Sequence, residues 1–204
     1  WKDQFEFAGF YAAKEKGFYK DVGLDVHFKS FDPTKDIIDE VLEGRAQYGV
    51  TYSTLISRYI KGDPLVFVAN FFKYSPLMIV SQEEFALPSD LKGKKVMGIA
   101  NELSSETIMM MFKKFKVSAD DLEIITPTFK IQDFLDKKVD AMTVYSTNEI
   151  YELVRSKAKF NVLNPSAYGV PSYDLNLFTT QDELKKHPQR VAKFRAASIK
   201  GWEY

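Results

Sequence analysis

Apolar residues along the chain follow two alternating patterns. Short apolar runs have the length of strands, and between them lie segments in which apolar residues recur every three or four positions, as on one face of a helix. We expect strands at 24–28, 48–51, 65–69, 77–80, 96–99, 124–125 and 141–144. We expect helices at 8–19, 36–43, 53–60, 106–115, 132–137 and 148–156. This alternation is typical of an α/β fold with mostly parallel sheets flanked by helices.

The chain contains an internal similarity. Residues 42–54 align without gaps on residues 135–147, an offset of 93 positions (135 − 42 = 93). Each copy has a leucine and an acid at a helix end, a turn, a short strand and then Tyr-Ser-Thr. Any two αβ units share part of this pattern; the alternative is one copy in each of two lobes. Ligands of open α/β sheets bind beyond the carboxyl ends of strands, which makes candidates of Tyr52, Ser53, Tyr145 and Ser146.

Composition narrows the classes of function. Of the 204 residues, 28 are Lys or Arg and 28 are Asp or Glu, so the formal net charge is zero. Nucleic-acid binding and attachment to an anionic membrane surface both need a basic face, so we expect neither. The chain has no Cys and only two His, which excludes disulfides, thiol catalysis and thiolate or multi-histidine metal sites. Its apolar content of 45% is enough for the core of one large domain or two lobes.

Motifs that carry catalysis are missing from the sequence. There is no G-x-S-x-G elbow, P-loop, G-x-G-x-x-G or H-E-x-x-H motif. No apolar run approaches the ~20 residues of a membrane span. We therefore expect no catalytic residue, metal or cofactor. Because the chain opens on Trp1 and closes within a predicted helix at Tyr204, we expect a trimmed or mature fragment.

Several motifs carry a resemblance to a known family. The first 26 residues, WKDQFEFAGFYAAKEKGFYKDVGLDV, are the most specific of them. GRAQYGV at 44–50, DLKGKKV at 90–96, KVDA at 138–141 and RAASIKGWEY at 195–204 follow in the expected order. Together they resemble bacterial periplasmic substrate-binding proteins of the thiamine-pyrimidine-precursor type, which are related to the sulfonate, nitrate and taurine binders. The similarity covers essentially the whole chain.

The resemblance implies a two-lobed periplasmic-binding-protein-like fold of type II. Each lobe is expected to hold a mostly parallel sheet flanked by helices, and two crossings of the chain to form the hinge. Lobe 1 is then 1–74 with 176–204, and lobe 2 is 75–175. A small polar, pyrimidine-like ligand is expected in the cleft between the lobes, buried by hinge closure.

The same resemblance implies a periplasmic or extracytoplasmic location and a monomer. Expected partners are the small-molecule ligand and either the membrane subunits of an ABC importer or a fused signalling module. The first case is a solute-binding component, and the second is a sensor domain of a histidine kinase or diguanylate cyclase. A third alternative is an enzyme like the eukaryotic pyrimidine-precursor synthases. Those enzymes carry a cysteine-rich motif and an active-site histidine, and since this chain has no Cys, we expect no enzyme. The family also has an apolar strand before the position of Trp1, which this sequence does not include.

The start of the first helix is one candidate region for ligand binding. Trp1, Gln4, Phe5 and Phe7 precede a helix whose start, near Ala8, we expect to present free backbone N–H groups to a polar ligand. Aromatic side chains there suit stacking on a flat ring. Packing of the helix on the sheet is the alternative role for these aromatic residues. Glycine at the next position suits close approach by a ligand or by a neighbouring backbone.

A second candidate region lies at 98–106, where a glycine at a strand end is followed by Asn101, Ser104 and Ser105. Such a segment suits a carboxylate, phosphate or sulfonate, and ordinary N-capping is the alternative. Asn148 lies in a Ser-x-x-Glu capping box, whose Glu149 we expect to be structural.

Tyr173 and Asp174 lie where the chain is expected to recross between the lobes. They contact the ligand from the hinge, or they belong to a flexible loop without ligand contact.

Overall fold

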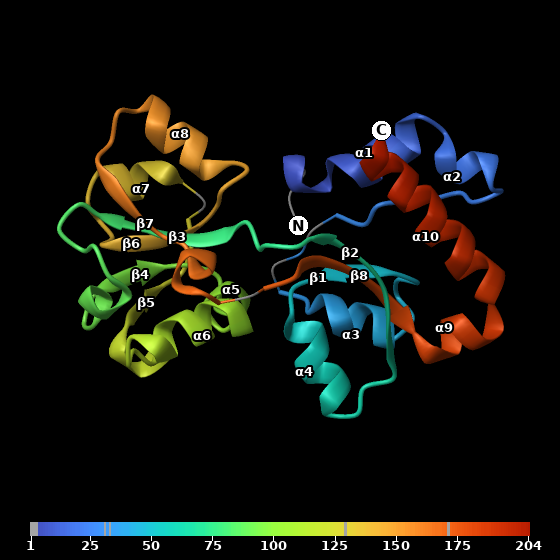
Figure 1. Ribbon diagram of the computed structural model, residues 1–204, viewed down its shortest axis with the longest axis horizontal. Coiled ribbons are helices and arrows are strands. Elements are labelled where there is room, and N and C mark those ends of the chain that lie inside the picture. Colours follow the sequence, from blue (N-terminus) through green and yellow to red (C-terminus); the bar gives the residue numbers. More distant parts are fainter. Residues whose placement is uncertain (1–3, 31, 33, 129, 171) are drawn as a thin grey trace. The chain divides into compact units, whose positions relative to one another are not determined.

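The computed structural model describes residues 4–30, 32, 34–128, 130–170 and 172–204 (Figure 1). Two compact units make up the chain. Unit 1 comprises Trp1–Phe72 and Asp174–Tyr204, and unit 2 comprises Lys73–Tyr173. The chain therefore passes from unit 1 to unit 2 once and returns once. The lobe boundaries expected after residues 74 and 175 lie two residues beyond these junctions.

Three strands form the sheet of unit 1 in the order β1-β8-β2. They are β1 (Gly49–Thr51), β8 (Asp174–Thr180) and β2 (Leu65–Phe72). β8 runs antiparallel to both neighbours, so β1 and β2 are parallel to each other across it. The carboxyl ends of β1 and β2 therefore lie at the same edge of the sheet, where β8 begins.

Helices cover both faces of the unit 1 sheet (Figure 1). On one face lie α1 (Ala8–Glu15) and α10 (Pro188–Glu203), and on the other α3 (Ile37–Leu42) and α4 (Thr54–Ile60). Leu177 packs with the first pair and the next residue, Phe178, with the second, because neighbouring residues of a strand point to opposite faces. The other helical segments are η1 (Phe5–Phe7), α2 (Phe18–Asp21) and α9 (Gln181–Lys186).

Two glycines let α1 and α10 pack closely. A Cβ atom added at Gly9 would lie 2.3 Å from the Trp202 ring, and one added at Gly201 would lie 2.1 Å from the carbonyl oxygen of Gly9. Gly9 therefore serves the approach of a neighbouring helix, one of the two roles expected for it. Behind this contact the hydroxyls of Tyr19 and Ser198 form a buried hydrogen bond of 2.9 Å.

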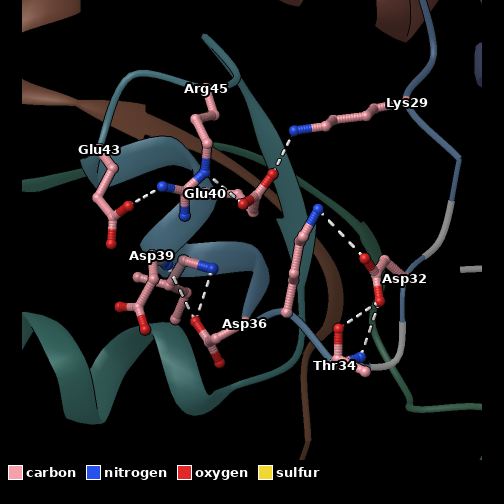
Figure 2. Close-up of polar contacts among 10 residues, drawn as sticks. Lys29, Asp32, Thr34, Asp36, Asp39, Glu40, Glu43 and Arg45 are labelled. Atoms are coloured by element: carbon pink, nitrogen blue, oxygen red, sulfur yellow. Dashed lines mark hydrogen bonds and ion pairs between the residues drawn. The ribbon is translucent and has the colours of Figure 1, made fainter.

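A network of charged residues ties the loop before α3 to that helix (Figure 2). The largely buried Glu40 of α3 accepts hydrogen bonds from Lys29 and Arg45, and these cations hold the pKa of its carboxyl below its ordinary value. Asp36 caps α3 by accepting hydrogen bonds of 2.8 and 3.0 Å from two backbone N–H groups of the first turn. Stabilisation of α3 explains these contacts, and we assign them no ligand.

Five strands form the sheet of unit 2 in the order β5-β4-β6-β3-β7. Strands β4 (Lys95–Met97), β5 (Glu123–Ile125) and β6 (Ala141–Tyr145) are parallel. Strand β3 (Leu77–Gln82) pairs antiparallel with β6 and with β7 (Phe160–Leu163). The carboxyl ends of β4, β5 and β6 share one edge of this sheet.

Helices also cover both faces of the unit 2 sheet (Figure 1): α7 (Ile131–Leu135) and α8 (Glu149–Arg155) on one, α5 (Ala100–Leu103) and α6 (Glu106–Lys114) on the other. Phe134 and Leu153 bury the first pair against the sheet, and Ile108, Met111 and Phe112 of α6 are also buried. The remaining turns are η2 (Pro88–Leu91), η3 (Ala119–Asp121) and η4 (Pro165–Tyr168). None of the described helices is both long and apolar enough to cross a membrane.

The α/β class is confirmed, but the expectation of mostly parallel sheets is wrong for the described strands. Both pairings of unit 1 are antiparallel, and unit 2 has two of each kind. The reason is that β3 and β8, which begin just after the chain enters each unit, run against the strands of the βα units.

The segment 24–28 is also not a strand. Leu24 and Val26 turn inward against the core of unit 1 while Asp25 and His27 point outward, but the segment has no ladder among the described residues. Its alternation therefore reflects burial of one side and not membership of a sheet.

Candidate functional site

Polar side chains gather at the edge of the unit 1 sheet where β1 and β2 end. Thr51 of β1 pairs with Asn176 of β8, which pairs with Asn70 of β2. Directly paired residues of neighbouring strands lie on one face of a sheet, so these side chains form a polar row. Asn70 Nδ2 donates hydrogen bonds to Asn176 Oδ1 (2.9 Å) and to the carbonyl oxygen of Asp174 (2.6 Å). The row therefore holds amide groups in fixed orientations.

Three residues expected from the sequence lie at this same edge. Tyr52 and Ser53 follow β1 directly, and Asp174 is the first residue of β8. Asp174 is 5% exposed, and its Oδ1 accepts a hydrogen bond of 2.7 Å from the backbone N–H of Leu175. Leu175 has a φ of 55°, a left-handed backbone that leucine rarely adopts. The structure thus brings these residues to one strand-end edge of unit 1, and their contact with a ligand stays a prediction.

The N-terminal candidates have different surroundings. Phe7 is partly buried against the core of unit 1, whereas Phe5 is 76% exposed and Gln4 precedes the η1 turn. We expected a free backbone N–H near Ala8, and this expectation is wrong for Ala8 itself. The η1 turn precedes α1, and the carbonyl oxygen of Phe5 accepts a hydrogen bond from the Ala8 N–H. Trp1 lies outside the described residues. Phe7 therefore packs against the core, which is the alternative role expected for these aromatic residues.

In unit 2 the parallel strands β4 and β6 end beside a buried carboxyl. Glu102 of α5 is 4% exposed. Its Oε2 accepts hydrogen bonds from the Thr143 hydroxyl (2.6 Å) and the backbone N–H of Ile99 (3.4 Å), and the carboxylate also accepts one from the Tyr145 hydroxyl. Since Thr143 and Tyr145 belong to β6, this one carboxyl ties the helix after β4 to the end of β6.

The protonation of Glu102 is shifted toward neutral pH. Burial raises the pKa of its carboxyl from the ordinary 4.5 to about 7, and the charge of Glu149 adds to the rise, while the three hydrogen bonds oppose it. Glu149 begins α8, where its Oε2 accepts a hydrogen bond from the backbone N–H of Tyr145 (2.8 Å) and its Oε1 one from Asn148 (2.8 Å). Two neighbouring carboxyls in different environments therefore lie at this strand end.

The two serines of the 98–106 segment differ in burial and in hydrogen bonding. Ser105 is 1% exposed, and its Oγ accepts a hydrogen bond from the backbone N–H of Ile108 (3.5 Å) and donates one to the carbonyl oxygen of Glu102 (2.6 Å). It caps α6, the alternative expected for it, whereas Ser104 is exposed. Nothing is described of the Asn101 side chain, although its backbone belongs to α5.

The remaining two candidates in unit 2 are Asn148 and Tyr173. Asn148 occupies the N-cap position of α8 without capping it by its side chain, and Tyr173, just before the return to unit 1, is 54% exposed. Of the unit 2 candidates, the structure brings together Tyr145 and Ser105, which both contact Glu102.

Sequence reasoning missed the polar residues that sit inside strands and short helices. Thr51, Asn70 and Asn176 form the row of unit 1, and Glu102 with Thr143 forms the centre of the unit 2 cluster. One signal was available, because an acid or amide within an otherwise apolar strand or helix run needs a partner when buried. The partner itself is distant in sequence, so only the fold identifies it.

A groove of about 500 Å³ lies in unit 1 between β2 and α10, and Asn70 of the polar row is one of the residues that line it. Aromatic side chains of Phe67, Phe71 and Trp202 line it, together with Arg195 and Glu203. None of the residues expected from the sequence to bind a ligand is among the described residues lining this groove. Within the described residues, no group of three or more His, Asp or Glu side chains is placed to hold a metal ion.

The fold is that of periplasmic solute-binding proteins. The alkanesulfonate-binding protein SsuA of Xanthomonas axonopodis pv. citri, solved with MOPS bound, is similar with a TM-score of 0.72 and 14% identity over 95% of this chain and 69% of that one. SsuA of Escherichia coli, a periplasmic aliphatic sulphonate binding protein, is similar with a TM-score of 0.68 and 17% identity over 96% and 69%. At these identities the similarity establishes the two-lobed type II architecture.

Within this class the sequence has a defined family. Residues 4–204 match the model of the NMT1/THI5-like family, and the chain belongs to that family. The resemblance to thiamine-pyrimidine-precursor binding proteins is thereby confirmed. A curated relative is the 4-amino-5-hydroxymethyl-2-methylpyrimidine phosphate synthase THI11 of Saccharomyces cerevisiae, 23% identical over 211 aligned residues. The alignment takes in 95% of this chain but spans only 62% of the length of that relative.

Proposed function

We propose that this chain is a solute-binding protein for a small polar molecule. The observation that carries the proposal is that each unit places fixed polar side chains at the edge where its parallel strands end. Unit 1 offers the row Thr51, Asn176 and Asn70 there, and unit 2 the pair Glu102 and Thr143. Ligands of α/β folds bind at such edges. The fold shared with solute-binding proteins supports the same conclusion.

The chemistry of these edges favours a ligand rich in hydrogen-bond donors, such as an aminopyrimidine. Glu102, Glu149 and Asp174 are carboxyl groups, and the row of unit 1 adds amide oxygens. Carboxylates accept hydrogen bonds and repel anions. A pyrimidine ring with an amino group presents donors at its edge and flat faces on which Tyr52 or Phe5 stacks. A sulfonate needs donors, which these carboxyls do not supply when ionised.

As to cellular role, the proposal is delivery of the solute to the membrane subunits of an ABC importer from an extracytoplasmic location. The relatives solved as periplasmic binding proteins support it. A sensor domain fused to a signalling module is the alternative. The sequence that follows Tyr204 in the full gene separates the two, since an apolar span and a signalling domain there favour sensing.

An enzyme is the remaining alternative, favoured by the similarity to the yeast pyrimidine phosphate synthase. We propose binding without turnover, because the chain has no Cys and because His27 lies on the surface in a 3.0 Å pair with Asp25. Prolonged incubation with a bound pyrimidine, followed by mass spectrometry, distinguishes the two. Recovery of unchanged solute agrees with a binding protein, and a new product identifies an enzyme.

The binding proposal is tested by titration calorimetry of the full chain. The panel contains 4-amino-5-hydroxymethyl-2-methylpyrimidine, MOPS and histidine, one each for the pyrimidine, sulfonate and amino-acid classes. We expect binding of the pyrimidine, weakened by the Ser53→Ala and Asn70→Ala variants and unchanged by Ser89→Ala, which lies in η2 away from the strand ends. A folded protein that binds no member of any class contradicts the proposal.

A further inference from the structure

Glu102 occupies a position that its part in the fold does not fully explain. It lies on α5, directly after β4, and its carboxyl reaches two residues of β6, Thr143 and Tyr145. At 4% exposure it is removed from solvent, where an unpaired charge is costly. Glutamine would satisfy the same neighbours without that cost. What an acid adds at this position is a proton that it can gain or lose.

The direction in which the two β6 hydroxyls point their hydrogens depends on whether Glu102 is charged. An ionised carboxylate is only an acceptor, so Thr143 and Tyr145 both donate to it. Their oxygens then have only lone pairs left for another partner. When Glu102 carries a proton, it donates to one of these oxygens, and that hydroxyl turns its own hydrogen outward. One proton on Glu102 thus reverses the hydrogen-bonding sense of a hydroxyl at the end of β6.

Thr143 is the hydroxyl placed to pass this change on. It is half-buried, while Tyr145 is 6% exposed. The close packing of Gly98 against Thr143 keeps this side chain in place, since a Cβ atom added at Gly98 would lie 2.9 Å from the Thr143 hydroxyl. The Thr143 side chain therefore has little room to change rotamer when the charge of Glu102 changes. It responds by rotating its hydroxyl hydrogen.

Four groups on the packed elements face Glu102 in the part of the chain that the structure describes. They are the Thr143 and Tyr145 hydroxyls of β6, the backbone N–H of Ile99 before α5, and the carboxylate of Glu149 at the start of α8. Among them only Glu149 carries a further negative charge, and burial is the larger reason for the pKa of about 7. Glu102 therefore gains or loses its proton at a pH near 7, within the pH range of cells and their surroundings.

We propose that Glu102 is a positioning residue whose proton sets whether the hydroxyl of Thr143 accepts from the bound solute or donates to it. This inference rests on the proposed solute-binding function and adds a specificity to it. In the ionised state unit 2 selects solutes that donate, such as amines and amino-heterocycles. In the protonated state it selects solutes that accept, such as carbonyl compounds and sulfonates.

The first experiment uses the full chain without solute. The pH titration of the Thr143 Cβ and Tyr145 Cζ chemical shifts is followed by NMR from pH 5 to pH 9. We expect both to titrate with the carboxyl of Glu102, to lose that titration in Glu102→Gln and to keep it in Glu149→Gln. Glu149 lies beside the same residues and is the matched control. Shifts that ignore Glu102, or that follow Glu149 instead, overturn the proposal.

The second experiment measures the affinity of 4-amino-5-hydroxymethyl-2-methylpyrimidine at pH 6 and pH 8. With a pKa of about 7, the ionised fraction of Glu102 rises about tenfold between these values, so a solute bound only by the ionised form tightens about tenfold. Titration of the probe itself is common to all variants, so the comparison with Glu102→Gln isolates the residue. We expect Glu102→Gln and Thr143→Val to remove the excess pH dependence and Thr143→Ser to restore it.

The outcomes of the two experiments are separable. If none of the panel binds, the proposed function fails together with the selectivity, and the NMR titration still decides whether Glu102 orients the hydroxyls. If the pyrimidine binds with the same pH dependence in wild type and Glu102→Gln, solute binding stands and the inference is overturned.

Discussion

The packing of α1 on α10 gives a prediction in which two effects oppose each other. Replacing Gly201 by alanine adds a methyl group to a helix, which by intrinsic propensity stabilises it by about 1 kcal/mol. That methyl would lie 2.1 Å from the carbonyl oxygen of Gly9 and 2.7 Å from the Cβ atom of Ala13. Carbon atoms at optimal separation are about 3.5 to 4.0 Å apart. The two helices must therefore separate by roughly 1 Å or more.

Such overpacking costs about 1 to 3 kcal/mol, and here it meets backbone, which cannot rotate away as a side chain does. The contact also belongs to a layer that contains the Trp202 ring, stacked on Phe71 at 5.2 Å, so separation loosens further contacts. We expect the steric term to exceed the propensity gain and Gly201→Ala to lower the free energy of unfolding by a net of about 1 kcal/mol. For a chain of this length that corresponds to a fall in Tm of about 2 to 4 °C.

The assay is urea unfolding followed by circular dichroism, with Ala196→Gly as the control. Ala196 is an exposed residue of the same helix, so this variant reports propensity alone and should lose about 1 kcal/mol. A Gly201→Ala variant as stable as wild type, or more stable, would refute the close approach of α1 and α10.

Three further predictions concern buried polar groups. Burial raises the pKa of Glu102 from 4.5 to about 7, so the folded state binds the proton more tightly than the unfolded state. The free energy of unfolding should therefore rise as pH falls from 8 toward 5, by up to about 3 kcal/mol for a pKa difference of 7 − 4.5 = 2.5. Glu102→Gln should flatten that profile in thermal unfolding, and a profile that keeps its slope contradicts the assignment. Tyr19→Phe should cost about 1 to 2 kcal/mol in chemical unfolding, because it leaves the Ser198 hydroxyl buried without its 2.9 Å partner, and no loss would show that water replaces the phenol. Asn70→Ala should weaken pyrimidine binding more than it lowers Tm, since it releases Asn176 at the strand end, and the reverse order would mark the amide row as structural only.

The apolar runs of the sequence predicted many of the strands because a buried strand declares itself locally. The runs at 65–69 and 77–80 became β2 and β3, which continue through Asn70, Phe71 and Phe72 and through Ser81 and Gln82 respectively. Strand β8 went unrecognised since it alternates Asp174, Asn176 and Thr179 with apolar neighbours. These polar residues are buried because β8 is the central strand of its sheet, a fact that depends on distant β1 and β2. The segment 24–28 failed in the opposite way, with the right alternation but no strand beside it.

The candidate site was predictable in its location and much less so in its members. The repeated Tyr-Ser-Thr indicated strand ends, and Tyr52, Ser53 and Tyr145 do lie at the ends of β1 and β6. The sequence did not single out Glu102, because its role depends on hydrogen bonds to β6, some forty positions away in the chain. Hydrogen-bond partners across a sheet follow from register, which local patterns do not contain.

The measurement that most directly tests the central claim is calorimetric titration of the folded full chain with 4-amino-5-hydroxymethyl-2-methylpyrimidine at pH 8, beside MOPS and the Asn70→Ala and Glu102→Gln variants. The account predicts saturable one-to-one binding of the pyrimidine, tighter than that of MOPS and weakened by a variant in either unit. Absence of binding to the pyrimidine and to every other solute class, or binding that neither variant affects, would contradict it.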